Sequence, residues 1–171
     1  TLKDEGTIGR RLRTEGFDVI SLGMKSFLSA PIVTFKLIRL FKTLRPDAVY
    51  TWMYHADLLC GVVAFFCGVK NIIWGIRNSK IPQSSFSVTS VVRKICSVLS
   101  FHIPHKIVCC AEAAKLAHIE LGFCSSKMVV IPNGYDLRFF NPSSELRDRT
   151  RSNLGLSESH LVVGVVGRFD P

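Results

Sequence analysis

One unit recurs along this chain: a helical stretch, a glycine, and then a short run rich in β-branched residues. Each glycine stands where a left-handed residue would close the preceding helix, at Gly16, Gly68, Gly122 and Gly155. The β-rich runs that follow are 17–22, 69–76, 123–131 and 156–167, and two more lie at 47–52 and 105–110. These runs are almost continuously apolar, so we expect both of their faces to be buried. Such strands in alternation with helices predict a Rossmann-like, doubly wound parallel sheet of the α/β class.

Apolar residues at helical spacing predict helices over 31–44, 91–99 and 111–121. The uncharged run 58–69 is shorter than the roughly 18–20 residues that a bilayer span needs, so it reads as a buried helix. The serine-rich stretch 77–90 is predicted to be a loop at the carboxyl end of a strand. Asn141 or Ser143 is expected to cap a short charged helix that ends before Gly155.

The segment VVIPNGYDLRFFNP, residues 129–142, ends a core strand abruptly. Asn133 and Gly134 tolerate positive φ values, so we expect a sharp turn there. The predicted division is a first Rossmann-like domain over 1–135, a connector with a short helix over 136–158, and the first strand of a second domain over 159–171. We expect the amino-terminal strand of the first domain and most of the second domain to lie outside this sequence.

Composition limits the classes of partner. The 171 residues are 47% hydrophobic, which suffices for a packed core and argues against disorder. The formal net charge of +9 favours anionic partners such as nucleotide-sugars or phospholipid headgroups. The six cysteines show neither a CxxC pair nor metal-ligand spacing, and we expect reduced thiols in a cytosolic protein. Four histidines are expected on the surface or at strand edges, and neither metal nor cofactor is predicted; they are His102, His105, His118 and His160.

Ligands of open α/β sheets bind at the carboxyl ends of the strands, and polar residues follow several of the predicted strands. The candidates there are His55, Asp57, Arg77, Asn78, Glu112, Asn133 and Gly134. Structural alternatives stay open for three of them. His55 could cap its helix or pack on aromatic residues, Arg77 could be an ordinary loop cation, and Glu112 could simply complement a helix dipole.

Several common functional motifs are missing from the sequence. It contains no G-x-G-x-x-G, no Walker loop and no G-x-S-x-G elbow. Phe139 and Phe140 beside Arg138 are a thin case for nucleic-acid binding, which would need basic residues clustered with stacking aromatics on one face. We therefore expect no nucleic-acid partner.

Several segments, in order, resemble the group 1 (family 4) glycosyltransferases. They are RPDAVYTWMYHADLL, KIVCCAEAAKLAHIELGF, KMVVIPNGYDLRFFNP and VVGVVGRFDP. The resemblance implies a GT-B fold, in which this chain would form the amino-terminal half and the start of a second domain. It also implies transfer of a sugar from a nucleotide-sugar to an acceptor, without a metal and with retention of configuration. Gly167 and Arg168 resemble a Gly-Arg pair whose arginine contacts the donor diphosphate.

The chain departs from the family pattern at two positions. Arg77 stands where many members have a histidine near the reacting sugar. Arginine stays protonated and cannot act as a general base, so we expect Arg77 to contact a phosphate or hydroxyl. Cys110 stands where a serine is common. The catalytic residues are therefore left unassigned.

The resulting hypothesis is a hexosyltransferase-type enzyme that builds cell-surface polysaccharide or lipopolysaccharide. Its expected partners are a UDP-sugar donor and a glycan or lipid-linked acceptor, and the 171 residues alone are expected to be inactive. Three basic residues could hold the domain on the anionic inner face of the cytoplasmic membrane or could form a solvated helix face; they are Lys36, Arg39 and Lys42. Two alternatives remain, a GT-B-fold UDP-sugar epimerase and a non-catalytic α/β binding module.

Overall fold

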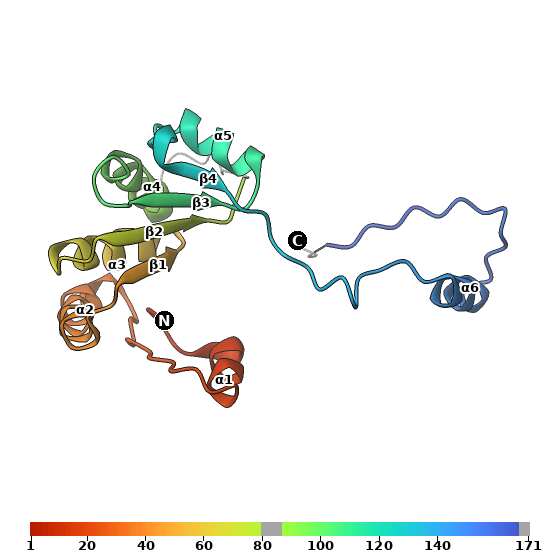
Figure 1. The fold of residues 1–171 in the computed structure, drawn as a ribbon, viewed down its shortest axis with the longest axis horizontal. Helices are drawn as coiled ribbons and strands as arrows, with labels where there is room; N and C mark the ends of the chain where they lie inside the picture. Colours follow the sequence, from red (N-terminus) through yellow and green to blue (C-terminus); the bar gives the residue numbers. More distant parts are fainter. Residues whose placement is uncertain (80–86, 168–171) are drawn as a thin grey trace. The chain divides into compact units, whose positions relative to one another are not determined.

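The computed structural model describes residues 1–79 and 87–167. The chain divides into two compact units, Thr1–Asn133 and Gly134–Pro171, and each is described by itself. The first unit holds a sheet of four parallel strands in the order β1-β2-β3-β4 (Figure 1). The strands are β1 (Ala48–Trp52), β2 (Asn71–Ile76), β3 (Lys106–Cys109) and β4 (Met128–Val130). The predicted parallel α/β sheet is therefore confirmed.

The described part of the first unit has five α-helices. They are α1 (Gly6–Thr14), α2 (Ala30–Leu44), α3 (Tyr54–Phe66), α4 (Val88–Leu99) and α5 (Glu112–Glu120), with short 3-10 turns at Phe27–Ser29 and Ser125–Lys127. Of these, α3, α4 and α5 connect the strands. Helix α3 packs on β1 and β2 and lies between α2 and α4, while α5 lies against β3 and β4. Among the described helices, none is both long and apolar enough to cross a bilayer.

Local sequence signals account for several helix ends. Ser87 begins α4 with a capping box, because its side chain accepts a hydrogen bond from Ser90 N and the Ser90 hydroxyl accepts one from Ser87 N. The four glycines expected to close helices all have left-handed φ values, +90° at Gly16, +82° at Gly68, +85° at Gly122 and +66° at Gly155. That prediction is confirmed.

The main core lies between the sheet and its helices, and the side chains of Ile72, Trp74 and Ile107 are fully buried in it. Helix α3 approaches β2 very closely at Gly61. A Cβ atom at this position would lie 2.6 Å from Trp74 Nε1, so only glycine allows this packing. A second cluster of buried side chains joins the amino-terminal segment to α2 and α3; it consists of Leu22, Val33, Leu37 and Val63.

The strand predicted over 17–22 is wrong. This segment is neither helix nor strand, although Leu22 N donates to Thr1 O at 3.0 Å and Met24 N donates to Leu2 O at 2.8 Å. It therefore pairs with the first residues of the chain over too short a length to form a strand, and it does not join the sheet.

The turn predicted at Asn133-Gly134 is also wrong, because neither residue has a positive φ. The chain turns a few residues later instead. Asp136 O accepts hydrogen bonds from the backbone N–H groups of Phe139 and Phe140, each at 3.0 Å. The Asp136 carboxylate also accepts from Arg138 N at 3.0 Å, so an aspartate side chain stabilises this turn.

The second unit contains one described helix, α6 (Ser144–Asn153). Ser143 caps it by accepting a hydrogen bond from Leu146 N at 3.2 Å, as one of the two predicted caps. Residues 161–167 are exposed and pair with no strand within the described residues, so the structure assigns no strand there. The division of the chain at 135 and 158 stays a prediction.

Candidate functional site

Side chains from three strands meet at the carboxyl edge of the sheet. Arg77 directly follows β2, and its Nη1 donates a hydrogen bond of 2.6 Å to Oδ1 of Asn133, three residues after β4. The guanidinium carbon lies 4.8 Å from the centre of the Trp52 ring at the end of β1, which is a cation–π contact. All three side chains are exposed. The edge therefore presents a positioned, solvent-accessible cation.

Trp52 owes its position to the backbone of β2. A Cβ atom on Gly75 would lie 2.5 Å from Trp52 Cδ1 and 3.0 Å from Thr51 O, so a side chain there would displace the indole. The next residue, Met53, has a φ of +76°, which is unfavourable for a residue with a Cβ atom. The junction between β1 and α3 is therefore locally strained at the point where the candidate site lies.

The buried side chain of Asp57 on α3 forms a hydrogen bond with β1 at this junction. Its side chain is 1% exposed, and Oδ1 accepts a hydrogen bond of 2.6 Å from Thr51 Oγ1. Burial raises the pKa of the Asp57 carboxyl to about 7, while hydrogen bonds from Thr51 and the Gly75 backbone oppose the rise. These hydrogen bonds link α3 to β1 and β2. Because the carboxylate is buried, Asp57 has a structural role and is not part of the exposed candidate site.

A buried hydrogen-bonded pair connects α3 with α5. The Tyr54 hydroxyl lies 2.5 Å from His118 Nε2, and His118 Nδ1 lies 2.7 Å from Ala114 O. Burial lowers the pKa of His118, which favours the neutral ring. In that form Nδ1–H donates to the carbonyl and Nε2 accepts the tyrosine proton. The Tyr54 hydroxyl also lies 3.3 Å from Asn78 Oδ1. The buried tyrosine–histidine pair is therefore in contact with Asn78, which is one of the candidate site residues.

The surface position predicted for His118 is therefore wrong, since its side chain is 0% exposed. The ring packs against Phe123, with centroids 5.2 Å apart. One sequence signal was available, because His118 follows Ala114 by one turn of the predicted alanine-rich helix 111–121, and the two residues therefore share a helix face. Sequence reasoning also missed Tyr54, which has no motif around it and is identified only by its partner 64 residues away.

The remaining candidates lie in other parts of the fold or in the second unit. His55 is half-buried in the walls of two cavities beside α3, and Glu112 is exposed at the start of α5. Gly134 and Gly167 belong to the second unit, and both are exposed. Arg168 lies outside the described residues. Within the described residues, no group of three or more His, Cys, Asp or Glu side chains could hold a metal ion.

Residues 2–139 match the model of Glycosyltransferase Family 4. The chain belongs to this family. The match covers most of the sequence, including all four strands and the carboxyl edge described above. The resemblance noted from the sequence segments is therefore confirmed.

The chain is similar to an Escherichia coli UDP-Gal:alpha-D-GlcNAc-diphosphoundecaprenol alpha-1,3-galactosyltransferase. It is 27% identical over 149 residues, which cover 86% of this chain and 37% of the relative. The chain thus spans well under half of that relative's length.

Solved structures show the same fold. Anabaena HepE in complex with UDP superposes with a TM-score of 0.71 at 16% identity, over 88% of this chain and 40% of HepE. The UDP-N-acetylglucosamine 2-epimerase from Rickettsia bellii gives a TM-score of 0.52 at 17% identity, over 92% of this chain and 40% of the epimerase. The Rossmann-like half of a GT-B fold, predicted from the sequence, is confirmed.

Proposed function

We propose that this chain is the acceptor-side part of a retaining glycosyltransferase that moves a hexose from a UDP-sugar to a glycan or lipid-linked acceptor. Membership of glycosyltransferase family 4 is the observation that carries the proposal. The E. coli relative uses UDP-Gal, and HepE has been solved with UDP and with UDP-glucose. Because the chain spans about 40% of HepE, we propose that it works together with a donor-binding domain whose first strand is 159–171 and includes Gly167 and Arg168.

Arg77 is the side chain that the proposal places nearest the reaction. A guanidinium stays charged at neutral pH, so it can stabilise negative charge on a phosphate but cannot remove a proton. Asn133 accepts one of its N–H groups and Trp52 covers one part of its surface, which leaves other N–H donors for a ligand. In this proposal, Arg77 binds and orients substrate, and Asn78 and Asn133 position the edge around it.

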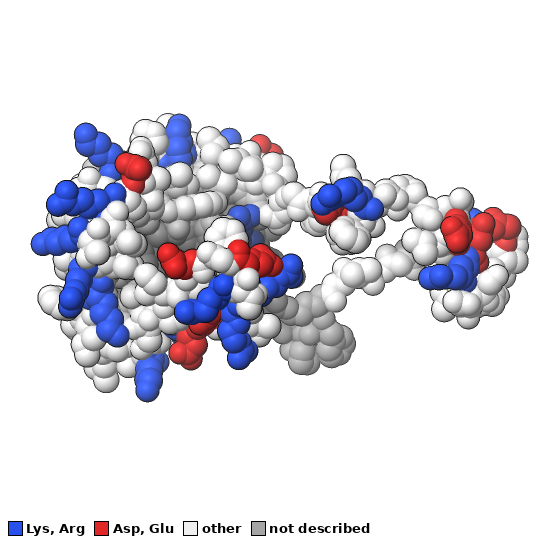
Figure 2. Space-filling view, turned by 60° about the horizontal axis from the view of Figure 1, so that its bottom comes forward, with Lys and Arg blue, Asp and Glu red and all other residues white. Residues whose placement is uncertain are grey.

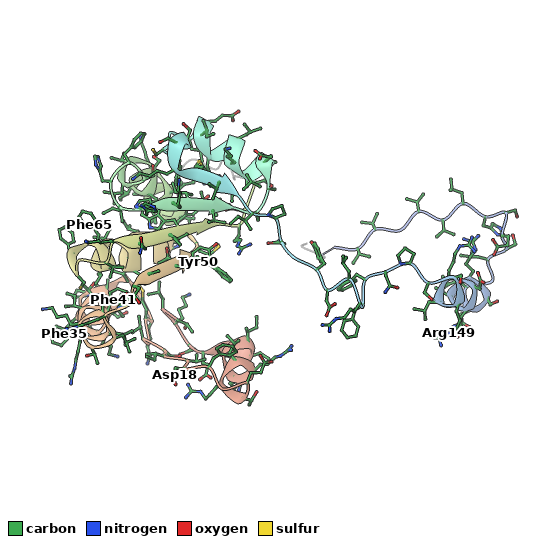
Figure 3. The ribbon with its side chains drawn as sticks, viewed as in Figure 1. Asp18, Phe35, Phe41, Tyr50, Phe65 and Arg149 are labelled. Atoms are coloured by element: carbon green, nitrogen blue, oxygen red, sulfur yellow. The ribbon has the colours of Figure 1, made fainter. Side chains whose placement is uncertain are left out.

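The assay uses the full-length protein with labelled UDP-galactose or UDP-glucose and an acetylglucosamine-diphosphate lipid. We expect transfer in the presence of EDTA, because the proposed reaction needs no metal. Arg77→Ala should lower kcat/KM by roughly a hundredfold, the size of a lost charge contact in a transition state. Arg149→Ala, on the exposed face of α6 (Figure 3), is the matched control and should have no effect.

The same assay separates the alternatives. The likeness to the Rickettsia epimerase makes epimerisation a defined second outcome. Epimerised UDP-sugar without any acceptor would overturn the transferase proposal, and no turnover of any UDP-sugar would favour a binding module. Sugar transfer that is equal with wild-type protein and Arg77→Ala would leave the transferase but remove the role of Arg77.

We also propose peripheral contact of α2 with an anionic membrane on its cytoplasmic face. Helix α2 carries two exposed apolar side chains, Ile32 (63% exposed) and Phe35 (68% exposed; Figure 3). The same helix carries exposed Arg39 and Lys42, and Lys36, whose ammonium also donates a hydrogen bond to Leu22 O. Lysine and arginine side chains line the left edge of the first unit in Figure 2, and most of the acidic side chains on that face lie farther to the right. Apolar groups flanked by cations suit a bilayer interface with anionic headgroups.

Vesicle sedimentation tests the membrane proposal. We expect stronger partitioning onto phosphatidylglycerol vesicles than onto phosphatidylcholine vesicles, and weaker partitioning for Phe35→Ser. Equal partitioning onto both kinds of vesicle would remove the proposal without affecting the transferase assignment.

A further inference from the structure

An apolar cavity of about 320 Å³ lies between α2 and α3, and Arg77 is not among the residues that line it. Four aliphatic side chains of α3 line it, Leu58, Leu59, Val62 and Val63, and α2 contributes Ala30 and Thr34. Ligand pockets for small molecules begin at about 300 Å³, so the cavity is large enough for a ligand segment. Its wall is almost wholly hydrocarbon, so that segment must itself be hydrocarbon.

A second cavity of about 350 Å³ adjoins the first, because Met24 and His55 line both. Here the character of the wall changes, since Lys3, Lys25 and Ser26 contribute polar groups. Both lysines are exposed, and neither forms an ion pair within the described residues. The ammonium groups of Lys3 and Lys25 can bind the anionic head of a ligand, while the adjoining apolar cavity can hold its apolar tail.

The walls are held in place by packing. Leu2 and Met24 pack against the buried cluster that joins the amino-terminal segment to α2 and α3. Lys36 Nζ also donates a hydrogen bond of 3.2 Å to Leu22 O, which fastens α2 to the same segment. The two cavities therefore lie within one packed region of the first unit.

We propose that these two cavities form one binding site for a single-chain lipid phosphate, with the chain in the apolar cavity and the phosphate at Lys3 and Lys25. The apolar cavity is near the small end of the range for ligand pockets, so it takes a segment of one hydrocarbon chain and not the two chains of a bilayer lipid. This inference rests on the proposed function and deepens it, because it chooses the lipid-linked acceptor over a free glycan and gives it a binding site.

The position of His55 connects this site to the proposed reaction. His55 is the second residue of α3, and α3 begins two residues after Trp52 at the carboxyl edge of the sheet. A phosphate held beside His55 would therefore leave the sugar attached to it next to that edge. The lipid would anchor the acceptor, and the sugar would be the part that reaches the donor.

The test is calorimetric titration of the chain with farnesyl diphosphate, and it contains no nucleotide-sugar. We expect farnesyl diphosphate to bind at least tenfold more tightly than farnesol, inorganic diphosphate or dihexanoyl phosphatidic acid. The double variant Lys3→Gln/Lys25→Gln should weaken binding roughly five- to tenfold, as two partly exposed charge contacts would. Lys94→Gln, an exposed lysine on α4 outside both cavities, is the matched control and should bind as the wild type does.

A second variant addresses the apolar end. Thr34→Phe places a ring in the cavity and should abolish binding of farnesyl diphosphate, with folding checked by circular dichroism. If that variant does not fold, the affinity of the Lys3→Gln/Lys25→Gln variant for farnesyl diphosphate is by itself the test of the binding site. Equal binding of farnesol or of the two-chain phosphatidic acid, or an unchanged affinity in the lysine variant, would overturn the inference. Sugar transfer by the full-length protein is measured separately, so such a failure would leave the transferase proposal standing.

Discussion

Replacing the buried Asp57 by asparagine should remove a pH-dependent part of the stability of this chain. The carboxyl has a pKa of about 7 in the folded state, against an ordinary value of 3.8, because burial disfavours its charged form. Between these two values the folded state binds more protons than the unfolded state, so stability falls as the pH rises. The contribution is fully present below about pH 4 and is lost by the time the pH has passed 7.

The size of the effect follows from the shift in pKa. Each unit of difference corresponds to about 1.4 kcal/mol, so the ionised carboxylate costs the folded state about 4 kcal/mol at high pH. Between pH 5 and pH 7 the loss amounts to about 2 kcal/mol. Asparagine keeps an oxygen that can accept the Thr51 hydrogen bond but does not ionise, so the variant lacks this slope.

The assay is urea unfolding of the chain at pH 5, 6, 7 and 8, followed by tryptophan fluorescence, since Trp74 is fully buried in the folded state. The quantity of interest is the difference in unfolding free energy between wild type and Asp57→Asn, plotted against pH. Asp18→Asn, at an exposed position (Figure 3), is the control and should follow the wild type. Parallel curves for wild type and Asp57→Asn would refute the reasoning.

Three further changes test other contacts. Gly61→Ala should destabilise the chain by about 1–3 kcal/mol in urea unfolding, because its Cβ would lie 2.6 Å from Trp74 Nε1. Tyr54→Phe removes the hydrogen-bond donor to the buried His118 Nε2 and should cost about 1–3 kcal/mol, whereas Tyr50→Phe on the exposed part of β1 should cost little. Ser87→Ala removes the cap of α4 and should cost about 1 kcal/mol, measured as a lower midpoint of thermal unfolding. A Tyr54→Phe variant as stable as wild type would mean that the buried tyrosine–histidine contact contributes nothing.

Sequence patterns predicted the helix ends well, because each end depends on residues that are near neighbours, and they predicted the parallel sheet from the alternation of helices and strands. The glycines after α1, α3, α5 and α6 have the expected left-handed φ values, since each helix end is decided by its own last turn. The prediction of a strand at 17–22 was wrong, because this apolar run has the composition of a strand but does not pair with the sheet. Strand pairing needs a partner, and composition does not specify one.

The candidate site was only partly predictable for a related reason. The rule that ligands bind at the carboxyl ends of strands pointed to Arg77 and Asn133. Their hydrogen bond, however, joins residues 56 positions apart, and it depends on the register of three strands. The same holds for Tyr54 and His118, whose roles arise only when α3 and α5 lie together.

The sequence by itself determined the alternation of helices and strands, the helix ends and the membership of glycosyltransferase family 4, because these are recorded in short-range patterns and motifs. Only the tertiary structure decided which side chains are buried and which meet. It buried Asp57 and His118, placed Arg77 against Trp52 and Asn133, and formed the cavities beside α3. Burial and contact are properties of packed elements that lie far apart in the chain, so no local pattern specifies them.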